Sequence, residues 1–295
     1  MSSSSQDRRE QPAADLYRAP APVRMLLGGL SRLAPPAAVR LATYLFGRPR
    51  RGKVRPEEEE TLAGARAFRM EVEGRQLACW RWGEGPIVFL HHGWGSRGSR
   101  MVPFVVPITS RGFQVITYDA PAHGDSEGRT TTAPDIGRGL VELEEKLGGF
   151  HGIIAHSVGC WAAAVGMRRG LGVRRAVFVS PPGDLDYFAV FFTRQMGFTD
   201  EVRERMEEVF RERTGVPWDT LQPERMAPPD PPPLLVFHDQ EDSVVPEEHA
   251  RRVVEAWKGA GLVETRGLGH RKILRDPEVV SRAVDFITQG SERAG

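Results

Sequence analysis

GIIAHSVGCWAAA, residues 152–164, is the stretch of the chain that decides the fold. It joins a short apolar run to an alanine- and glycine-rich run with no linker between them. The first run predicts a buried strand and the second a helix, so the chain turns sharply at Ser157. Ala155 and Gly159, two positions before and after the serine, are small enough for the backbone to pack closely around that turn.

Further short apolar runs lie on both sides of this stretch. The runs PIVFLHH, FQVITYDA, RAVFVS and LLVFHD predict buried parallel strands, whereas FRMEVEG and RQLACWRW alternate like an antiparallel hairpin around Glu73 and Gly74. Helices are expected near residues 99–111, 134–147, 158–170, 247–258 and 277–289. Alternating strands and helices predict a doubly wound α/β fold, with a mostly parallel sheet and an antiparallel N-terminal edge.

A segment between two predicted strands, residues 183–232, is too long for an ordinary connection and has its own amphipathic pattern. We expect it to form a small helical cap inserted into a core made of residues 61–182 and 233–295. Four of its side chains are candidates for lining a substrate pocket: Phe188, Phe191, Phe192 and Met196. Plain packing would explain the same apolar spacing.

Residues 1–60 predict an N-terminal arm, with a polar, disordered tail followed by two short amphipathic helices. Arg24, Arg32 and Arg40 cut its apolar part into short pieces, and Pro35 and Pro36 break any continuous helix. The arm is therefore expected neither to span a bilayer nor to act as a signal peptide. Packing on the domain is the simpler role for it, and peripheral membrane contact through residues 23–53 is the alternative.

Composition excludes several classes of protein. Of 295 residues, 40% are hydrophobic and 27% charged, and a net charge of +1 gives no electrostatic reason to expect nucleic-acid binding. Two cysteines are too few for a disulfide scaffold or a cysteine-based zinc site, which favours a reducing, cytoplasmic location. Nothing in the sequence predicts an oligomeric state.

Chemistry enters through Ser157. A plain helix N-cap would explain this serine by itself. A nucleophilic serine, however, needs a base and an orienting acid, and both follow later in the chain. Asp242 follows the predicted strand LLVFHD and His270 follows ETRGLG, so both lie where the active-site loops of such a sheet gather. The amide of Val158 begins the helix and can stabilise an oxyanion.

Five motifs together resemble the α/β-hydrolase family of serine hydrolases, over about residues 67–289. They are the His92–Gly93 pair, the loop of residues 119–126, the turn at Ser157, the Asp242 loop and the Gly-Leu-Gly-His270 loop. The resemblance implies the triad order serine, acid, histidine, and a second oxyanion amide from Trp94. Ala155 and Ala122 stand where the family more often has glycine.

The sequence thus predicts a serine hydrolase that cleaves a small-molecule carboxylic ester, or a thioester or small amide, through an acyl-enzyme on Ser157. An acyltransferase, a C–C bond hydrolase, a haloperoxidase or a catalytically silent binding protein are the alternatives.

The glycines of residues 93–98 fit a dinucleotide motif, but Pro103 and Pro107 interrupt the helix which that motif requires. No cofactor is expected, and because the histidines lack ligand spacing, no metal either.

Overall fold

The computed structural model describes residues 18–290. Its centre is one eight-stranded sheet with the order β1-β2-β4-β3-β5-β6-β7-β8. β1 and β2 form the antiparallel hairpin, β2 pairs antiparallel with β4, and the remaining pairs are parallel. The strand bounds are β1 Arg66–Val72, β2 Arg75–Trp82, β3 Ile87–His91, β4 Gln114–Tyr118, β5 Gly152–His156, β6 Arg175–Val179, β7 Leu234–Asp239 and β8 Gly261–Thr265.

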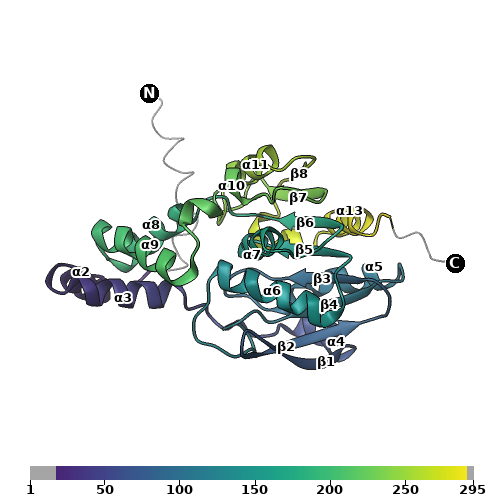
Figure 1. The fold of residues 1–295 in the computed structure, drawn as a ribbon, viewed down its shortest axis with the longest axis horizontal. Helices are drawn as coiled ribbons and strands as arrows, with labels where there is room; N and C mark the ends of the chain where they lie inside the picture. The colour runs from purple at the N-terminus through teal and green to yellow at the C-terminus, as the bar shows by residue number, and fades with distance from the viewer. Residues whose placement is uncertain (1–17, 291–295) are drawn as a thin grey trace.

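Helices cover both faces of the sheet, as expected for apolar strands buried on two sides (Figure 1). Alternate strand residues enter two separate cores, so Phe89 faces one core while Val88 and Leu90 face the other. Helices α6 Ala133–Leu147, α7 Val158–Arg168 and α11 Glu247–Ala256 pack on the first core. α5 Val105–Thr109 and α13 Pro277–Ile287 pack on the second. The doubly wound α/β prediction is therefore confirmed.

The helix predicted near residues 99–111 differs in its geometry. Residues Gly98–Phe104 form a 3-10 helix (η1), and only the short α5 continues it as an α-helix. Pro103 lies inside the 3-10 segment, where its missing N–H interrupts the α-helical hydrogen-bond pattern. The α4 helix, Pro56–Ala63, packs against η1.

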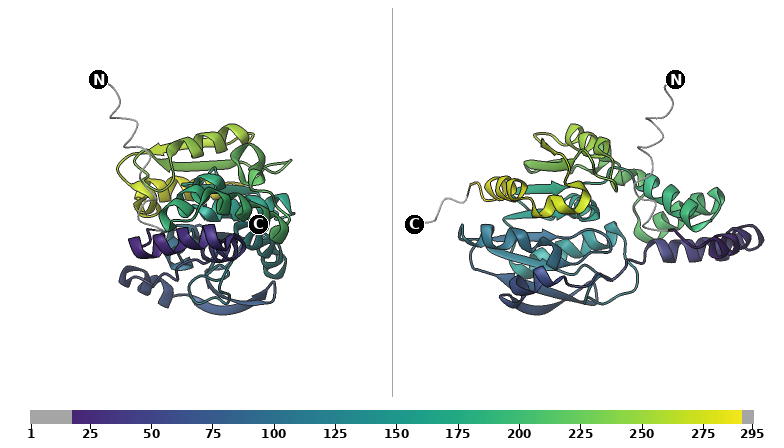
Figure 2. Two further views of the ribbon diagram at one scale, coloured as in Figure 1. Left: turned by 90° about the vertical axis from the view of Figure 1, so that its left-hand side faces the viewer. Right: turned by 180° about the vertical axis from the view of Figure 1, so that it is seen from behind.

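Four helices form a lobe beside the sheet, which we call the helical lobe (Figures 1 and 2). Two, α2 Ala21–Leu33 and α3 Pro35–Phe46, come from the predicted N-terminal arm. The other two, α8 Leu185–Met196 and α9 Asp200–Thr214, lie between β6 and β7, where they are followed by η2 Trp218–Leu221 and α10 Pro223–Met226. α2 packs on α8, and α3 packs on both α8 and α9. The predicted polar tail falls mainly on residues 1–17, outside the described residues.

The last elements of the described residues are α12 Gly269–Lys272, η3 Ile273–Arg275 and α13. Within residues 18–290, no helix has both the length and the apolar character needed to cross a membrane.

Candidate active site

Ser157 lies in a strained turn between β5 and α7. Its φ of 52° and ψ of −128° place a residue with a Cβ atom in a costly region of backbone space. Ser157 is the N-cap residue of α7, but its side chain makes no cap hydrogen bond, so side-chain capping does not explain the serine at this position. A Cβ atom on Gly159 would lie 2.7 Å from the His91 ring and from the His92 carbonyl oxygen. Only glycine fits at position 159, where α7 passes the end of β3.

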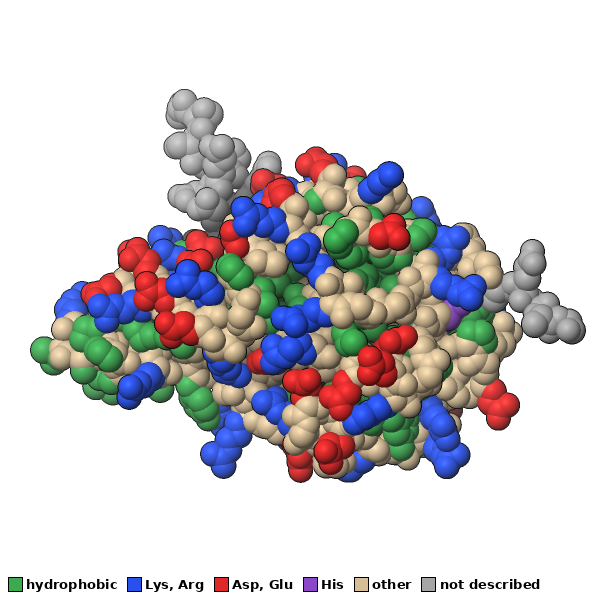
Figure 3. Space-filling model, in the orientation of Figure 1, with side chains coloured by type: hydrophobic (Ala, Val, Ile, Leu, Met, Phe, Trp, Pro, Cys, Tyr) green, Lys and Arg blue, Asp and Glu red, His purple; other side chains and the backbone are tan. Residues whose placement is uncertain are grey.

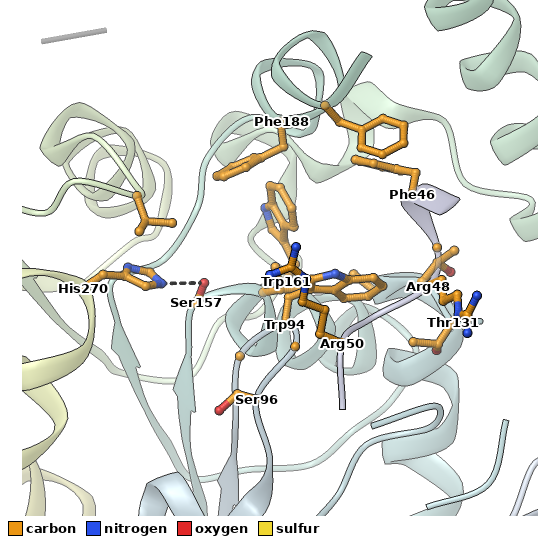
Figure 4. Close-up of a pocket in the computed structure, with 18 of the residues that line it drawn as sticks. Phe46, Arg48, Arg50, Trp94, Ser96, Thr131, Ser157, Trp161, Phe188 and His270 are labelled. Atoms are coloured by element: carbon orange, nitrogen blue, oxygen red, sulfur yellow. Dashed lines mark hydrogen bonds between the residues drawn. The ribbon is translucent and has the colours of Figure 1, made fainter. Parts of the chain in front are cut away.

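Three predicted residues meet at the carboxyl ends of the strands. His270 Nε2 lies 3.1 Å from Ser157 Oγ (Figure 4), and His270 Nδ1 lies 2.8 Å from Asp242 Oδ2. An ionised carboxylate only accepts hydrogen bonds, so Nδ1 carries the ring proton and Nε2 is free to accept the serine proton. The arrangement can therefore activate a hydroxyl nucleophile.

Asp242 is buried, yet it is held in the ionised form. Burial alone would raise its pKa, but the hydrogen bond and charge of His270 and the amide of Val245 lower the pKa to about 2. The Val244 and Val245 amides donate to Oδ1 at 2.8 and 3.0 Å, and His270 contacts Oδ2. Both carboxylate oxygens are thus occupied, which fixes the orientation of the side chain toward the imidazole.

The His270 loop is held from two sides. Asp239 accepts hydrogen bonds from the Thr265 hydroxyl and the Leu268 amide, which ties the loop to the end of β7. His156 Nε2 donates to the His270 carbonyl oxygen at 2.9 Å. Burial and the nearby His270 charge lower the pKa of His156 to about 3, so this donor is a neutral ring. His156 thus gives polar support to the loop, although it directly precedes the serine in sequence.

The loop after β3 passes directly over the serine. A Cβ atom on Gly93 would lie 3.0 Å from Ser157 Cβ. His92 accepts a hydrogen bond from the Ala120 amide with Nε2, so its Nδ1 carries the proton and donates to the Gly93 carbonyl oxygen at 2.8 Å. That carbonyl belongs to the same peptide unit as the Trp94 N–H, which points the opposite way in a trans peptide. The Ser96 amide donates to the same carbonyl oxygen at 3.2 Å, so His92 and Ser96 together fix the orientation of the Trp94 amide.

The loop of residues 119–126 has a structural role that explains the dinucleotide-like glycines. Asp119 accepts from the Gly98 amide at 2.8 Å and pairs with the buried Arg97 at 3.1 Å. A Cβ atom on Gly98 would lie 2.6 Å from the Tyr118 carbonyl oxygen, so that position needs glycine for packing. Ala122 has a φ of 67°, the positive value at which an alanine is strained.

Ser157, His270, Trp94 and Val158 all line one cavity of about 640 Å³. Among the described residues, no group of three or more His, Cys, Asp or Glu side chains could hold a metal ion. Cys160 follows the serine by one helical turn, but it is buried among apolar side chains, and burial raises the pKa of its thiol well above the usual value. A thiolate nucleophile at that position is therefore disfavoured.

Three of the four predicted pocket residues line the cavity, namely Phe188, Phe192 and Met196. The prediction for Phe191 is wrong, because this half-buried residue is not part of the lining. Steps of four residues keep the first three on one face of α8, whereas Phe191 is rotated away from that face by the helical repeat.

Sequence reasoning missed a second wall of the cavity. Phe46, Arg48 and Arg50, from the end of α3 and the segment after it, line the cavity with the serine. Figure 4 shows Phe46 and Phe188 on one side of the cavity, and Ser157, Trp94 and Arg50 on the other. The charge run of residues 48–53 was the available signal, but nothing in the sequence indicated that this segment lies against the cap.

Family comparison agrees with this geometry. The model of the alpha/beta hydrolase family matches residues 87–283, which is well over half of the chain. The chain belongs to the alpha/beta hydrolase family. A search among curated proteins finds no match.

Solved structures share the fold at low sequence identity. The chain is similar to a membrane phospholipase A described as a bacterial virulence factor, with a TM-score of 0.60, 18% identity, and coverage of 90% of this chain and 97% of the other. An esterase from Pyrococcus furiosus gives a TM-score of 0.59, 20% identity, and coverage of 82% and 98%. An N-acyl homoserine lactone degrading enzyme gives a TM-score of 0.57 and 13% identity, with coverage of 74% of this chain and 99% of the other.

Proposed function

We propose that this member of the alpha/beta hydrolase family is a serine hydrolase that cleaves carboxylic esters through an acyl-enzyme on Ser157. Thioesters and small amides fall within the same chemistry. The observation that carries the proposal is the continuous hydrogen-bonded chain from Ser157 Oγ through the His270 imidazole to Asp242.

In the first half-reaction, Ser157 Oγ attacks the ester carbonyl carbon while His270 Nε2 takes the hydroxyl proton. The charge that develops on the carbonyl oxygen is held by the Trp94 and Val158 amides. Collapse of the tetrahedral intermediate breaks the bond to the alcohol oxygen, and His270 returns its proton to that leaving group. Asp242 stays ionised and stabilises the imidazolium in between.

In the second half-reaction, water attacks the acyl-enzyme. His270 takes a proton from the water, the bond from the acyl carbon to Ser157 Oγ breaks, and the proton returns to the serine. The Arg97–Asp119 pair and the His92 ring hold the surrounding loops but transfer no proton. No resident cofactor enters either step.

Hydrolysis of p-nitrophenyl esters from acetate to decanoate tests the proposal. Where attack of water is slower than acylation, the wild type should release a burst of p-nitrophenol equal to the enzyme concentration, since acylation frees the phenol first. Ser157→Ala should lose turnover by at least about 10⁴-fold. The matched control Cys160→Ser should retain the burst. Retained turnover in Ser157→Ala, or loss in a folded Cys160→Ser, would overturn Ser157 as the nucleophile.

A further inference from the structure

The cavity has two chemically different walls. One is apolar and comes mostly from the helical lobe, with Phe46, Leu185, Phe188, Phe192, Met196 and Phe210. Among the residues that the structure describes, the other wall carries seven arginines, and no Asp or Glu belongs to the lining. A cavity with these walls suits a ligand that has an apolar chain at one end and a negative charge at the other.

Three of the seven arginines already have carboxylate partners. Arg100 and Arg275 both pair with the buried Glu58, and Arg275 also pairs with Glu57 at 2.8 Å. Arg55 lies 3.9 Å from Glu57. These three contribute little free positive charge to the cavity.

The other four arginines lack such partners. Within residues 18–290, no ion pair joins a carboxylate to any of Arg18, Arg48, Arg50 and Arg271. All four are exposed although they line the cavity, so they lie at its opening. The Arg50 backbone packs within 4 Å of the Cβ position of Gly95, beside the loop that holds the Trp94 amide. A negative group bound there would sit close to the reacting centre.

The Trp161 indole adds an unpaired hydrogen-bond donor to the cavity lining. The Trp161 side chain lines the cavity and is only 2% exposed, yet its indole N–H has no hydrogen-bond partner among the described residues. Buried donors are normally satisfied, so this one is available to an acceptor on a bound molecule.

We propose that the substrate is an amphiphilic ester, in which an apolar acyl chain is joined to an alcohol that carries a phosphate or carboxylate. Arg48 and Arg50 bind the anionic group, and the lobe side chains bind the acyl chain. The proposal rests on the proposed serine hydrolase function and names its substrate class. Guanidinium groups suit both anions because they donate paired hydrogen bonds.

Three decanoyl esters test this, because they differ only in the alcohol: glycerol, glycerol 3-phosphate and glyceric acid. The wild type should show a kcat/KM at least about tenfold higher for an anionic ester than for the glycerol ester, and the advantage should fall as salt is added. Comparison of the glycerol 3-phosphate ester with the glyceric acid ester shows which of the two anionic groups the cavity prefers. Arg48→Gln/Arg50→Gln should lose the advantage of the anionic esters, through a rise in KM for those esters. The control Arg169→Gln, an exposed arginine outside the cavity, should keep the advantage.

Equal kcat/KM values for the three esters, or an advantage that survives in the double variant, would overturn the anionic substrate while leaving the hydrolase intact. Binding of decyl phosphate and decanol to Ser157→Ala, measured by calorimetry, decides the matter even without turnover. Tighter binding of decyl phosphate that depends on Arg48 and Arg50 supports the proposal, and equal binding contradicts it. Loss of the Ser157-dependent burst on p-nitrophenyl esters would instead count against the proposed function.

A separate observation concerns the outer face of α2. Met25, Leu26 and Leu33 are 78%, 71% and 89% exposed, whereas Leu27 and Ser31 face the lobe interior. The helix therefore carries apolar side chains on its outer face as well as on the face toward the lobe, unlike an ordinary surface helix. In Figure 3, green side chains gather along the lower edge of the helical lobe, with blue side chains among them.

The charges around this face have one sign. Residues 18–55 contain nine basic residues and no Asp or Glu. Five of the basic side chains are exposed on or next to α2 and α3: Arg18, Arg24, Arg32, Arg40 and Arg48. An apolar strip surrounded by basic side chains fits the surface of an anionic lipid bilayer. Burial of the apolar side chains and attraction of the basic side chains to the lipid headgroups both favour binding there.

We infer that the outer face of α2, from Val23 to Leu33, docks on an anionic lipid surface. Val23 also lines the catalytic cavity, as do Ala19 and Pro20 just before it, so docking would place the cavity beside the lipid. Three exposed apolar side chains give only weak, reversible binding by themselves, and the arginines supply the rest of the binding free energy.

Co-sedimentation of the full chain with vesicles tests this second inference. Binding to vesicles of 30% phosphatidylglycerol in phosphatidylcholine should exceed binding to pure phosphatidylcholine at least about tenfold. Met25→Glu/Leu26→Glu should lose that binding, and Val106→Glu, at an exposed apolar residue on α5, should not. Absence of binding, or binding unchanged in the double variant, would overturn the inference. So would a dimer that the double variant converts to a monomer, because a second copy would then cover this face.

Discussion

The turn at Ser157 and the helical lobe are built in opposite ways. Around the serine, neighbouring backbones approach so closely that Gly93 and Gly159 leave no room for a Cβ atom. In the lobe, segments far apart in sequence pack side by side, and Met25 and Leu33 remain largely exposed. The contrast indicates that the reacting groups are held by close backbone packing at the sheet end, whereas the lobe, which also keeps apolar side chains exposed, is suited to substrate selection.

The largest effect is expected from the acid. Asp242→Asn should lower kcat by about 10⁴-fold, because an amide no longer holds the His270 tautomer that accepts the serine proton. Steady-state kinetics on p-nitrophenyl butyrate measures the change. The neighbouring Glu241→Gln is the control, since Glu241 pairs only with the exposed Arg266. A mild effect of Asp242→Asn would assign the role to another acid.

The oxyanion loop should respond next. His92→Phe removes the side-chain donor to the Gly93 carbonyl oxygen and leaves the Ser96 amide as the remaining donor, so the Trp94 peptide is held less firmly and kcat should fall about tenfold to hundredfold with little change in KM. His151→Phe is the control, because His151 is also buried and contacts a backbone carbonyl, of Ile287, away from the cavity. Equal losses in the two variants would mean that His92 acts through stability alone.

Acid should lower the free energy of unfolding through the buried histidines at one end of the sheet. Burial lowers the pKa of His91, His92, His123 and His156 to about 3, below the ordinary 6.5. Above pH 6.5 neither the folded nor the unfolded state protonates them. As pH falls from 6.5 toward 3, only the unfolded chain gains protons, so the free energy of unfolding should fall by roughly 1 kcal/mol per pH unit for each ring. Urea unfolding at pH 7.5, 5.5 and 4.5 measures this, and a flat profile would contradict it.

The smallest effect belongs to the lobe. Gly197 has a φ of 86°, and a Cβ atom there would lie 2.6 Å from the Arg24 carbonyl oxygen in α2. Gly197→Ala should displace α2 and raise KM for decanoate esters a few-fold, with kcat for acetate unchanged. Gly215 also has a positive φ, but a Cβ atom there would have no described neighbour within 4 Å. The control Gly215→Ala therefore shows the effect of backbone strain without the displacement of α2. Identical KM values for the two variants would remove α2 from substrate binding.

This contrast also explains what could be predicted from the sequence. The strand, turn and helix around Ser157 are local patterns with fixed spacing, and Asp242 and His270 each follow a predicted strand, so these residues could be found by reading along the chain. The positions of Phe46 and Arg50 could not, because they depend on how α3 packs against helices more than 130 residues later. Phe191 was misplaced because apolar spacing alone does not say which face of a helix meets a cavity.

The most direct test of the central claim is to label the purified protein with a fluorophosphonate and map the adduct by peptide mass spectrometry. The account predicts one adduct on Ser157, absent from Ser157→Ala and strongly reduced in Asp242→Asn, because only an activated serine hydroxyl attacks the phosphorus. A folded wild-type protein that takes no label, or takes it on another residue, would contradict the assignment of Ser157 as the nucleophile.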